Sequence, residues 1–421
     1  MIRWANAFIV GCFLLCATVS QAKTPANPYA HPTAVEDASG HAMDHFYQSL
    51  RQTKAGKGKT RILQFGASHT AADLWTGTLR KLLQKRFGDG GLGFVMPVRP
   101  WRTYRHDGVR FENPKRRKYH WHWDFDRAKP KCNHEDGRLG LAGMRVQASN
   151  RKQWSRMQVT ASGRGQMTVE LIYEKRRGGG DLWLRTDAGR RRRIRTRSRR
   201  EGLGYHSITL RNRNHTFELR PRGNGLVQLY GAILERNQLG LVFDTAGING
   251  SRARSLLKWD SKRWIELVKR RDPDLIILAY GTNEAMDTNE PLRIYRSQLD
   301  RVLAKVRKAA PQASCLLVGP TDHPLVHREN REDNMPWFQH RTRTDDIISV
   351  QKEVSVAHNC AFWDSVAATG GPLSIIQWAH AEPQLAWQDY VHFTSRGYRV
   401  LANLLFDSLM RGYDAFAQEA S

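Results

Sequence analysis

Two kinds of apolar pattern divide this chain into parts. Before about residue 95 and again after residue 240, short continuous apolar runs alternate with longer stretches whose apolar residues recur every three or four positions. Runs such as DLIILAYG and SCLLVGP predict buried parallel strands, and stretches such as PLRIYRSQLDRVLAKVRKAA predict amphipathic helices. This alternation predicts an α/β domain built on a doubly wound parallel sheet with helices on both faces.

The expected elements of this domain can be placed along the sequence. We expect strands at 61–65, 239–247, 274–281, 314–320 and 360–364. We expect helices at 42–52, 72–87, 251–270, 291–310, 343–358 and 394–412.

A different pattern occupies the roughly 140 residues between these two parts. Here short segments alternate apolar and polar residues every second position, and Gly, Asn and Asp turns separate them at close spacing. That pattern is typical of an antiparallel β-sandwich. We therefore expect an N-terminal segment at 23–59, an α/β domain formed by 60–95 and 241–421, and an inserted sandwich at 96–240. The clearest sandwich segments are 155–162, 166–174, 180–186, 205–211, 215–221 and 225–234.

The first 22 residues have the features of a signal peptide. Arg3 supplies a positive charge, the run AFIVGCFLLCATV is apolar, and Ser20-Gln21-Ala22 forms a small-x-small cleavage site. The run is too short for a comfortable membrane span. We expect a periplasmic or otherwise exported protein with no membrane span after cleavage.

Three cysteines remain beyond that segment, Cys132, Cys315 and Cys360. Cys315 and Cys360 lie at the starts of expected strands, so an oxidising compartment would pair them if these strands are neighbours. Three unpaired thiols fit the sequence equally well.

The formal net charge is +27, and the excess is concentrated in one segment. Residues 175–200 hold twelve basic residues against two acids. Such a run predicts a solvated or mobile loop, and an anionic polymer is the alternative partner. Nucleic acid is not expected, because an exported chain rarely meets it.

Candidate catalytic residues follow the expected strands. Ser68 lies at a strand-to-helix turn, where its hydroxyl is exposed and backbone N–H groups are near, although a serine there is commonly only a helix cap. Gly250, Asn283 and the pair Asp389 and His392 lie in later loops. In an open parallel sheet these loops meet at the carboxyl ends of the strands.

The blocks FGASHT, GINGS, YGTNEA and DYVHF resemble those of the SGNH (GDSL-type) hydrolases. The sequence of residues 66–94, followed by a β-rich insertion, is similar to that of bacterial peptidoglycan O-acetylesterases. The resemblance implies a flavodoxin-like fold. It also implies a serine esterase that removes O-acetyl groups from cell-wall polysaccharide, with peptidoglycan as the expected partner and with no metal and no cofactor.

The roles that this resemblance implies can be assigned residue by residue. Ser68 is the expected nucleophile, His392 its base, and Asp389 the group that orients His392. The expected oxyanion hole comprises the Ser68 N–H, the Gly250 N–H and the Asn283 amide. Gly250 is favoured over Gly247 because it directly precedes an expected helix start, where the backbone must approach the substrate without a Cβ.

One residue departs from the family pattern. Ala67 stands where family members usually carry Asp between Gly and Ser. That aspartate is not a proton-transfer group and supports the turn, so its absence puts the rigidity of the serine loop in question. Each site residue also fits a structural role on its own: an ion pair for Asp389 and His392, a turn for Asn283, a helix start for Gly250.

Two further groups of residues invite functional interpretations. A metal site is conceivable at His120, His122, Asp124, Cys132 and His134, but their spacing favours a strand of alternating aromatic and polar side chains. Thirteen tryptophans would suit a glycan groove, and Trp387, two residues from Asp389, is the best candidate for the cleft. Core packing is the default for the others.

Two alternative functions stay open at the level of sequence. An O-acetyltransferase would use the same three residues and pass the acetyl group to a sugar hydroxyl. A non-catalytic glycan- or polyanion-binding protein would retain the fold with a decayed site, and Ala67 would be its sign. Neither the acetylated sugar nor the oligomeric state is encoded in these patterns.

Overall fold

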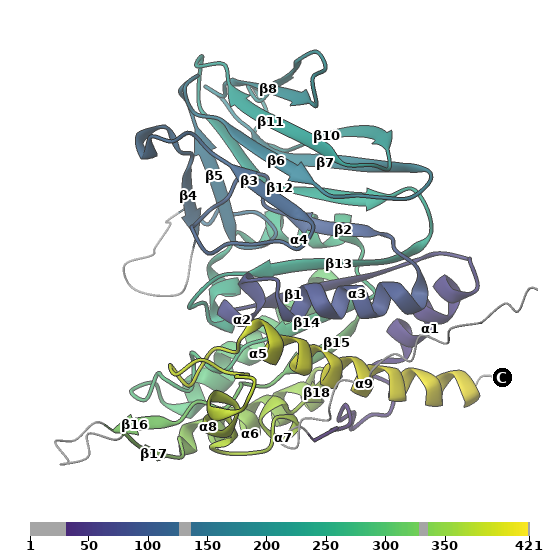
Figure 1. Ribbon diagram of the computed structural model, residues 1–421, viewed down its shortest axis with the longest axis vertical. Coiled ribbons are helices and arrows are strands. Elements are labelled where there is room, and N and C mark those ends of the chain that lie inside the picture. The colour runs from purple at the N-terminus through teal and green to yellow at the C-terminus, as the bar shows by residue number, and fades with distance from the viewer. Residues whose placement is uncertain (1–30, 126–135, 328–335, 420–421) are drawn as a thin grey trace, which may run out of the picture.

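The computed structural model describes residues 31–125, 136–327 and 336–419. Its centre is a five-stranded parallel sheet in the order β13–β1–β14–β15–β18 (Figure 1). These strands span, in the same order, Gly240–Gly247, Lys59–Gly66, Leu275–Ala279, Ser314–Val318 and Ala361–Trp363. Numbered along the chain, the order is 2-1-3-4-5, the doubly wound arrangement of flavodoxin-like folds. The predicted fold class is confirmed.

Helices cover both faces of this sheet because its strands are apolar on both sides. One face packs against α1, α3 and α9, and the other against α4, α5 and α6. The helices are α1 (Asp44–Lys54), α2 (Ser68–Ala71), α3 (Trp75–Phe87), α4 (Ser261–Arg271), α5 (Leu292–Ala309), α6 (Thr342–Ala357), α7 (Ser365–Ala368), α8 (Ser374–His380) and α9 (Ser395–Glu419). Among the described residues, 3₁₀ helices lie at Arg117–Tyr119 and Ala253–Lys258, and β16 (Leu325–His327) pairs antiparallel with β17 (Trp337–Gln339).

Two antiparallel sheets form the predicted sandwich above the parallel sheet (Figure 1). One contains β10 (Gly202–Arg211), β7 (Gln166–Lys175), β12 (Val227–Arg236), β5 (Met144–Ala148) and β4 (His122–Phe125), with β2 (Gly91–Val95) pairing to β12. The other contains β3 (Val109–Glu112), β6 (Ser155–Val159), β11 (His215–Pro221), β8 (Asp181–Thr186) and β9 (Arg192–Arg195). Along these strands, buried side chains alternate with more exposed ones. The buried side chains, such as Leu171 and Phe217, meet between the two sheets.

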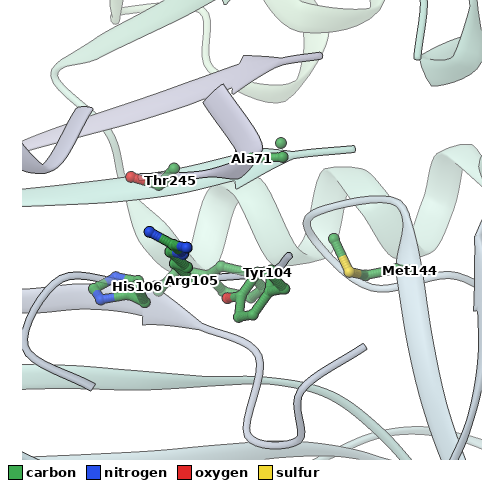
Figure 2. Close-up of a pocket in the computed structure, with 8 residues that line it drawn as sticks. Ala71, Tyr104, Arg105, His106, Met144 and Thr245 are labelled. Atoms are coloured by element: carbon green, nitrogen blue, oxygen red, sulfur yellow. The ribbon is translucent and has the colours of Figure 1, made fainter. Parts of the chain in front are cut away.

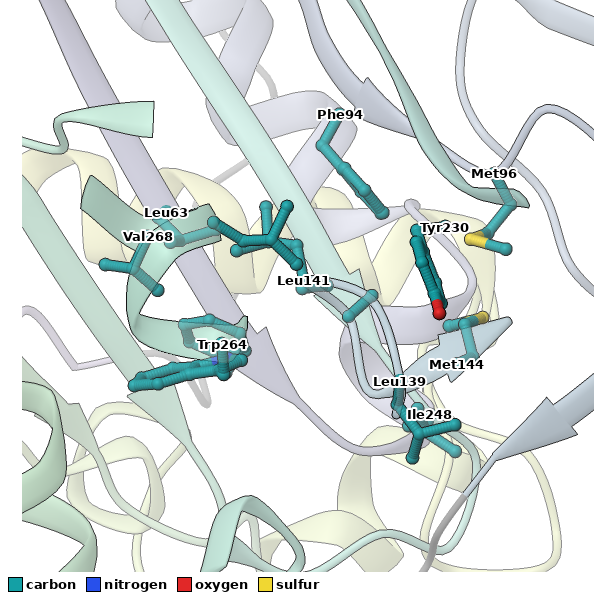
Figure 3. Close-up of a cluster of buried hydrophobic side chains, with 14 of the residues drawn as sticks. Leu63, Phe94, Met96, Leu139, Leu141, Met144, Tyr230, Ile248, Trp264 and Val268 are labelled. Atoms are coloured by element: carbon teal, nitrogen blue, oxygen red, sulfur yellow. The ribbon is translucent and has the colours of Figure 1, made fainter. Parts of the chain in front are cut away.

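The sandwich and the parallel sheet share one apolar core. Leu63 of β1 and Trp264 of α4 lie in the same buried cluster as Phe94 of β2 and Tyr230 of β12 (Figure 3). The sequence placed β2 in the first α/β segment. Because β2 pairs with β12, it belongs to the antiparallel sheet that contains β12. Its position directly after α3 carries the chain from one layer into the other.

Three expected elements differ from those observed. The helix expected at 251–270 is divided at Trp259, where the backbone is extended, and Asp260 caps the new helix by accepting a hydrogen bond from the Arg263 N–H. The helix expected at 72–87 begins at Trp75, because Asp73 has a left-handed backbone with φ of 49°. The arginine-rich segment expected as a loop includes a strand, β9, which pairs with β8 at the sheet edge.

Cys315 and Cys360 form a disulfide between the neighbouring strands β15 and β18. This resolves the pairing that the sequence left open. Cys132 and the proposed signal peptide lie outside the described residues. Over the described part of the chain, no helix combines the length and apolarity needed to cross a membrane.

Candidate active site

The candidate residues converge at the carboxyl end of the parallel sheet. Gly66, the last residue of β1, pairs in register with Gly247 of β13 on one side and Ala279 of β14 on the other. The three loops that follow these strands therefore start at the same level. The strand order reverses here, since β13 lies on one side of β1 and β14 on the other, and ligands of open α/β sheets bind at such a reversal point.

The serine turn is held by backbone contacts rather than by an aspartate. Ser68 is the first residue of α2, and the carbonyl of Ala67 accepts the N–H groups of Thr70 and Ala71 at 3.1 and 2.9 Å. Gly247 lets α2 approach β13 closely, because a Cβ on it would lie 2.4 Å from the Ala71 nitrogen. Ala67 itself is buried and offers no side-chain cap. The turn thus keeps its shape without the usual aspartate.

Three side chains form a continuous hydrogen-bonded chain. The Ser68 Oγ lies 2.9 Å from His392 Nε2, and His392 Nδ1 lies 2.8 Å from Asp389 Oδ2. His392 and Asp389 keep 40 % and 49 % of their side-chain surface exposed. The arrangement is that of a nucleophile, a general base and a carboxylate that orients the base, open to solvent on one side.

The loop before α9 fixes the carboxylate and the imidazole together. Asp389 Oδ1 accepts the backbone N–H groups of Val391 and His392 at 3.0 and 2.9 Å. Burial would raise the pKa of Asp389, but the hydrogen bonds from the His392 backbone and ring and from Val391 outweigh it and lower that pKa. The Trp387 N–H also donates to the His392 carbonyl at 2.8 Å. The carboxylate therefore stays ionised beside the imidazole.

The candidate oxyanion residues come from the loops after β13 and β14. Asn283 Nδ2 donates to the Ser251 carbonyl at 3.0 Å, which ties the amide to the residue that follows Gly250. A side-chain amide has two N–H groups, so one is left for a substrate oxygen. Gly250 has a left-handed backbone with φ of 73°, a conformation in which glycine is strongly favoured.

Glu284 connects these two loops by hydrogen bonds, a role that was not predicted from the sequence. Its buried carboxylate accepts the N–H of Ala253 at 2.8 Å and the N–H of Gly281 at 3.0 Å. It directly follows Asn283 in the block GTNEA, and a carboxylate beside a candidate oxyanion donor was the available signal.

Two further histidines lie near His392 and also went unassigned. The His69 ring centroid is 5.3 Å from that of His392, and His69 bonds Tyr398 Oη at 2.8 Å and Thr321 Oγ1 at 3.2 Å. Burial, reinforced by the charge of a protonated His392, lowers the pKa of His69 to about 3. Burial and then Arg341 lower the pKa of His323 to about 4. Both rings are therefore neutral at neutral pH.

The remaining candidates fall in different surroundings. Trp387 is 53 % exposed beside the triad, whereas Trp378 is fully buried in the core. Asp124 is paired with Arg145 at 2.9 Å, and the His120 ring bonds the Pro114 carbonyl. Cys132 and His134 lie outside the described residues. Within the described ranges no three His, Cys, Asp or Glu side chains form a group that fits a metal ion.

Comparisons with known proteins identify the family of one part of the chain. Residues 207–400 match the model of the GDSL-like lipase/acylhydrolase family, a range that includes Gly250, Asn283, Asp389 and His392 but not Ser68. A comparison with curated protein sequences finds no match.

Similar solved structures extend the comparison to almost the whole chain. A structure described as a peptidoglycan O-acetylesterase has 25 % identity and a TM-score of 0.71, and the alignment covers 91 % of this chain and 99 % of that one. A family two carbohydrate esterase from Cellvibrio japonicus has 11 % identity, a TM-score of 0.29, and coverage of 73 % and 98 %, too weak a likeness to support an argument. The chain therefore carries a domain of the GDSL-like lipase/acylhydrolase (SGNH) family and resembles a peptidoglycan O-acetylesterase along most of its length.

Proposed function

We propose that this protein is an exported esterase that removes O-acetyl groups from cell-wall polysaccharide, with peptidoglycan as its substrate. The observation that carries the proposal is the chain of hydrogen bonds from Ser68 through His392 to Asp389. The likeness to a peptidoglycan O-acetylesterase supports the choice of substrate. The disulfide between Cys315 and Cys360 supports an oxidising compartment outside the cytoplasm.

The first half of the reaction transfers the acetyl group to the enzyme. The Ser68 Oγ attacks the acetyl carbonyl carbon, and its proton passes to His392 Nε2. The Ser68 N–H, the Gly250 N–H and the Asn283 amide stabilise the negative charge on the carbonyl oxygen. The bond from carbon to the sugar oxygen then breaks, and His392 returns the proton to that oxygen.

The second half releases acetate. His392 removes a proton from a water molecule as the water attacks the acetyl-Ser68 carbonyl, and the returned proton frees the serine hydroxyl. Asp389 stabilises the imidazolium in both halves. The exposed surface of His392 and Asp389 gives water direct access, which favours hydrolysis over transfer to a second sugar.

Acetate release from O-acetylated peptidoglycan tests this proposal. We expect Ser68→Ala and His392→Ala each to lower the turnover number by at least about 10⁴-fold, because each removes a member of the triad. Equal release by the wild type and His392→Ala would remove the mechanism. Addition of an unacetylated glycan acceptor separates the two enzyme classes, since a transferase would move acetyl to the acceptor in place of releasing acetate.

A further inference from the structure

A large groove runs beside the candidate site, between the hydrolase domain and the sandwich. Its volume is about 820 Å³, within the range of ligand-binding clefts. Leu74 and Thr78 of the hydrolase domain form one wall, Arg105 and Phe111 of the insertion form another, and Arg399 of α9 completes it. The groove exists because the insertion packs against this face of the hydrolase domain.

The groove lies close to the reacting groups. Its lining includes Ala72, four residues after Ser68, and Ser395, three residues after His392. Four residues of helical chain rise about 6 Å, and three extended residues span at most about 11 Å. The backbone of the groove lining therefore comes within about 11 Å of Ser68 and of His392.

The lining of the groove is strongly cationic. Five Lys and Arg side chains face two carboxylates, those of Asp73 and Asp107. Asp73 is buried and bound by Arg80 at 2.7 Å, and Asp107 is bound by Lys81 at 2.5 Å. The five cationic residues are Lys81, Arg99, Arg105, Arg110 and Arg399.

Three of these guanidinium groups have no acidic partner. Arg105, Arg110 and Arg399 are exposed, and no side-chain hydrogen bond or ion pair to them occurs within the described ranges. A guanidinium presents a planar set of donors that matches a carboxylate and pairs with it in a bidentate manner. The groove thus offers three such donors to a ligand.

One residue of the groove lining, His106, has a buried ring nitrogen without a partner among the described residues. His106 is 3 % exposed, and its Nδ1 lies 3.0 Å from the Asp107 carbonyl, so this nitrogen carries the hydrogen. Its Nε2 is then an acceptor, and it has no hydrogen-bond partner among the described residues. Tyr104, Arg105 and His106 also line a separate small cavity, opposite Ala71 and Thr245 (Figure 2).

We propose that this groove holds the glycan strand next to the reacting acetyl group, with Arg105, Arg110 and Arg399 paired to carboxylates of its peptide stems. The proposal rests on the proposed function and adds the groups that the groove recognises, the carboxylates of the peptide stems.

Kinetics with two substrates test the proposal. The double variant Arg105→Gln, Arg399→Gln is compared with Arg193→Gln, a control at an exposed arginine of β9 that is remote in the fold. We expect the double variant to lose at least about tenfold in kcat/KM on O-acetylated peptidoglycan, mainly through KM, and to lose far less on 4-nitrophenyl acetate. The remaining polymer activity should also depend less on salt, since screening acts on these ion pairs.

Binding separates this proposal from the proposed function. Sedimentation of Ser68→Ala protein with unacetylated peptidoglycan needs no turnover, and amidation of the polymer carboxyls should weaken it as much as the two arginine substitutions do. Equal sedimentation with native and amidated polymer, or equal losses on both esters, would overturn the groove assignment. Ester hydrolysis without acetate release from peptidoglycan would instead overturn the proposed function.

Discussion

His392 is flanked by two imidazoles that hold no proton at neutral pH. Burial is the main cause of the low pKa of both His69 and His323, and each ring lies close enough for its charge to act on the triad. Were either protonated, it would repel the imidazolium that forms on His392 during the reaction. Because both rings are neutral, the Asp389 carboxylate is the charged group that interacts with His392.

These two buried rings predict how stability depends on pH. Their folded-state pKa values, about 3 and about 4, lie below the ordinary value of 6.5, so the unfolded chain binds more protons between these limits. The stability that these two neutral rings contribute is therefore fully present above about pH 6.5 and is lost as the pH falls. We expect the melting temperature to drop between pH 6.5 and 4, and His69→Gln, His323→Gln to reduce that drop. A drop of the same size in the double variant and the wild type would show that these two rings do not cause the pH dependence.

Asn283 predicts a second effect at the scale of one residue. Removal of one oxyanion donor lowers turnover by about 10² to 10³. We expect that loss in kcat for Asn283→Ala with little change in KM, measured with a small acetyl ester. Asn289→Ala, at an exposed position of the same loop, is the matched control. A wild-type kcat in Asn283→Ala would exclude this amide from the oxyanion hole.

At the scale of elements, the ends of the strands fix the positions of the loops that follow them. β1, β13 and β14 end in register, and the Glu284 carboxylate then ties the loop after β14 to the loop after β13. The site residues are far apart in the sequence, but each starts from a fixed strand end. This is how a four-residue helix, α2, can hold Ser68 in one position.

The disulfide between β15 and β18 gives a prediction at this scale. It closes a loop of 45 residues, for which the loss of unfolded-state entropy corresponds to about 4 kcal/mol. We expect Cys315→Ala, Cys360→Ala to lower the free energy of unfolding by up to that amount in denaturant titrations. A reducing agent should lower the wild type by a similar amount and leave the variant unaffected. Unfolding that is insensitive to the reducing agent would show that the two thiols are unpaired in solution.

At the scale of the whole molecule, a buried ionic network joins the two parts. Asp73 binds Arg80, Thr76 and Thr245 of the hydrolase domain and accepts the N–H of Asp107 of the insertion at 2.7 Å. The attraction of Arg80 outweighs burial and keeps the pKa of Asp73 low. This network therefore holds together the two parts of the molecule that form the groove.

Removal of this carboxylate predicts a large effect on stability. Asp73→Ala leaves the Arg80 guanidinium buried and unpaired, which typically destabilises a protein by about 3 to 5 kcal/mol. Glu201→Ala breaks the exposed ion pair with Arg138 and should cost less than about 1 kcal/mol. Denaturant titration of both variants checks the difference. Equal effects would show that Asp73 is not part of a buried network in solution.

The sequence by itself determined the kind of architecture and the residue types of the site. Continuous apolar runs alternating with amphipathic stretches specify a covered parallel sheet, because such strands must be buried on both faces. Period-two segments specify the sandwich. Ser68, Asp389 and His392 were identified from short blocks, since each block lies directly after a predicted strand or before the last helix.

Only the tertiary structure decided how distant residues meet. The burial that keeps His69 and His323 neutral, and the network around Asp73, depend on neighbours that are far away in the sequence. The left-handed backbone of Asp73 delays the start of one predicted helix, and the extended backbone at Trp259 interrupts another, since hydrogen bonds and caps outweigh propensity there. The cationic groove likewise arises where the insertion packs against the hydrolase domain, and no local pattern encodes such a surface.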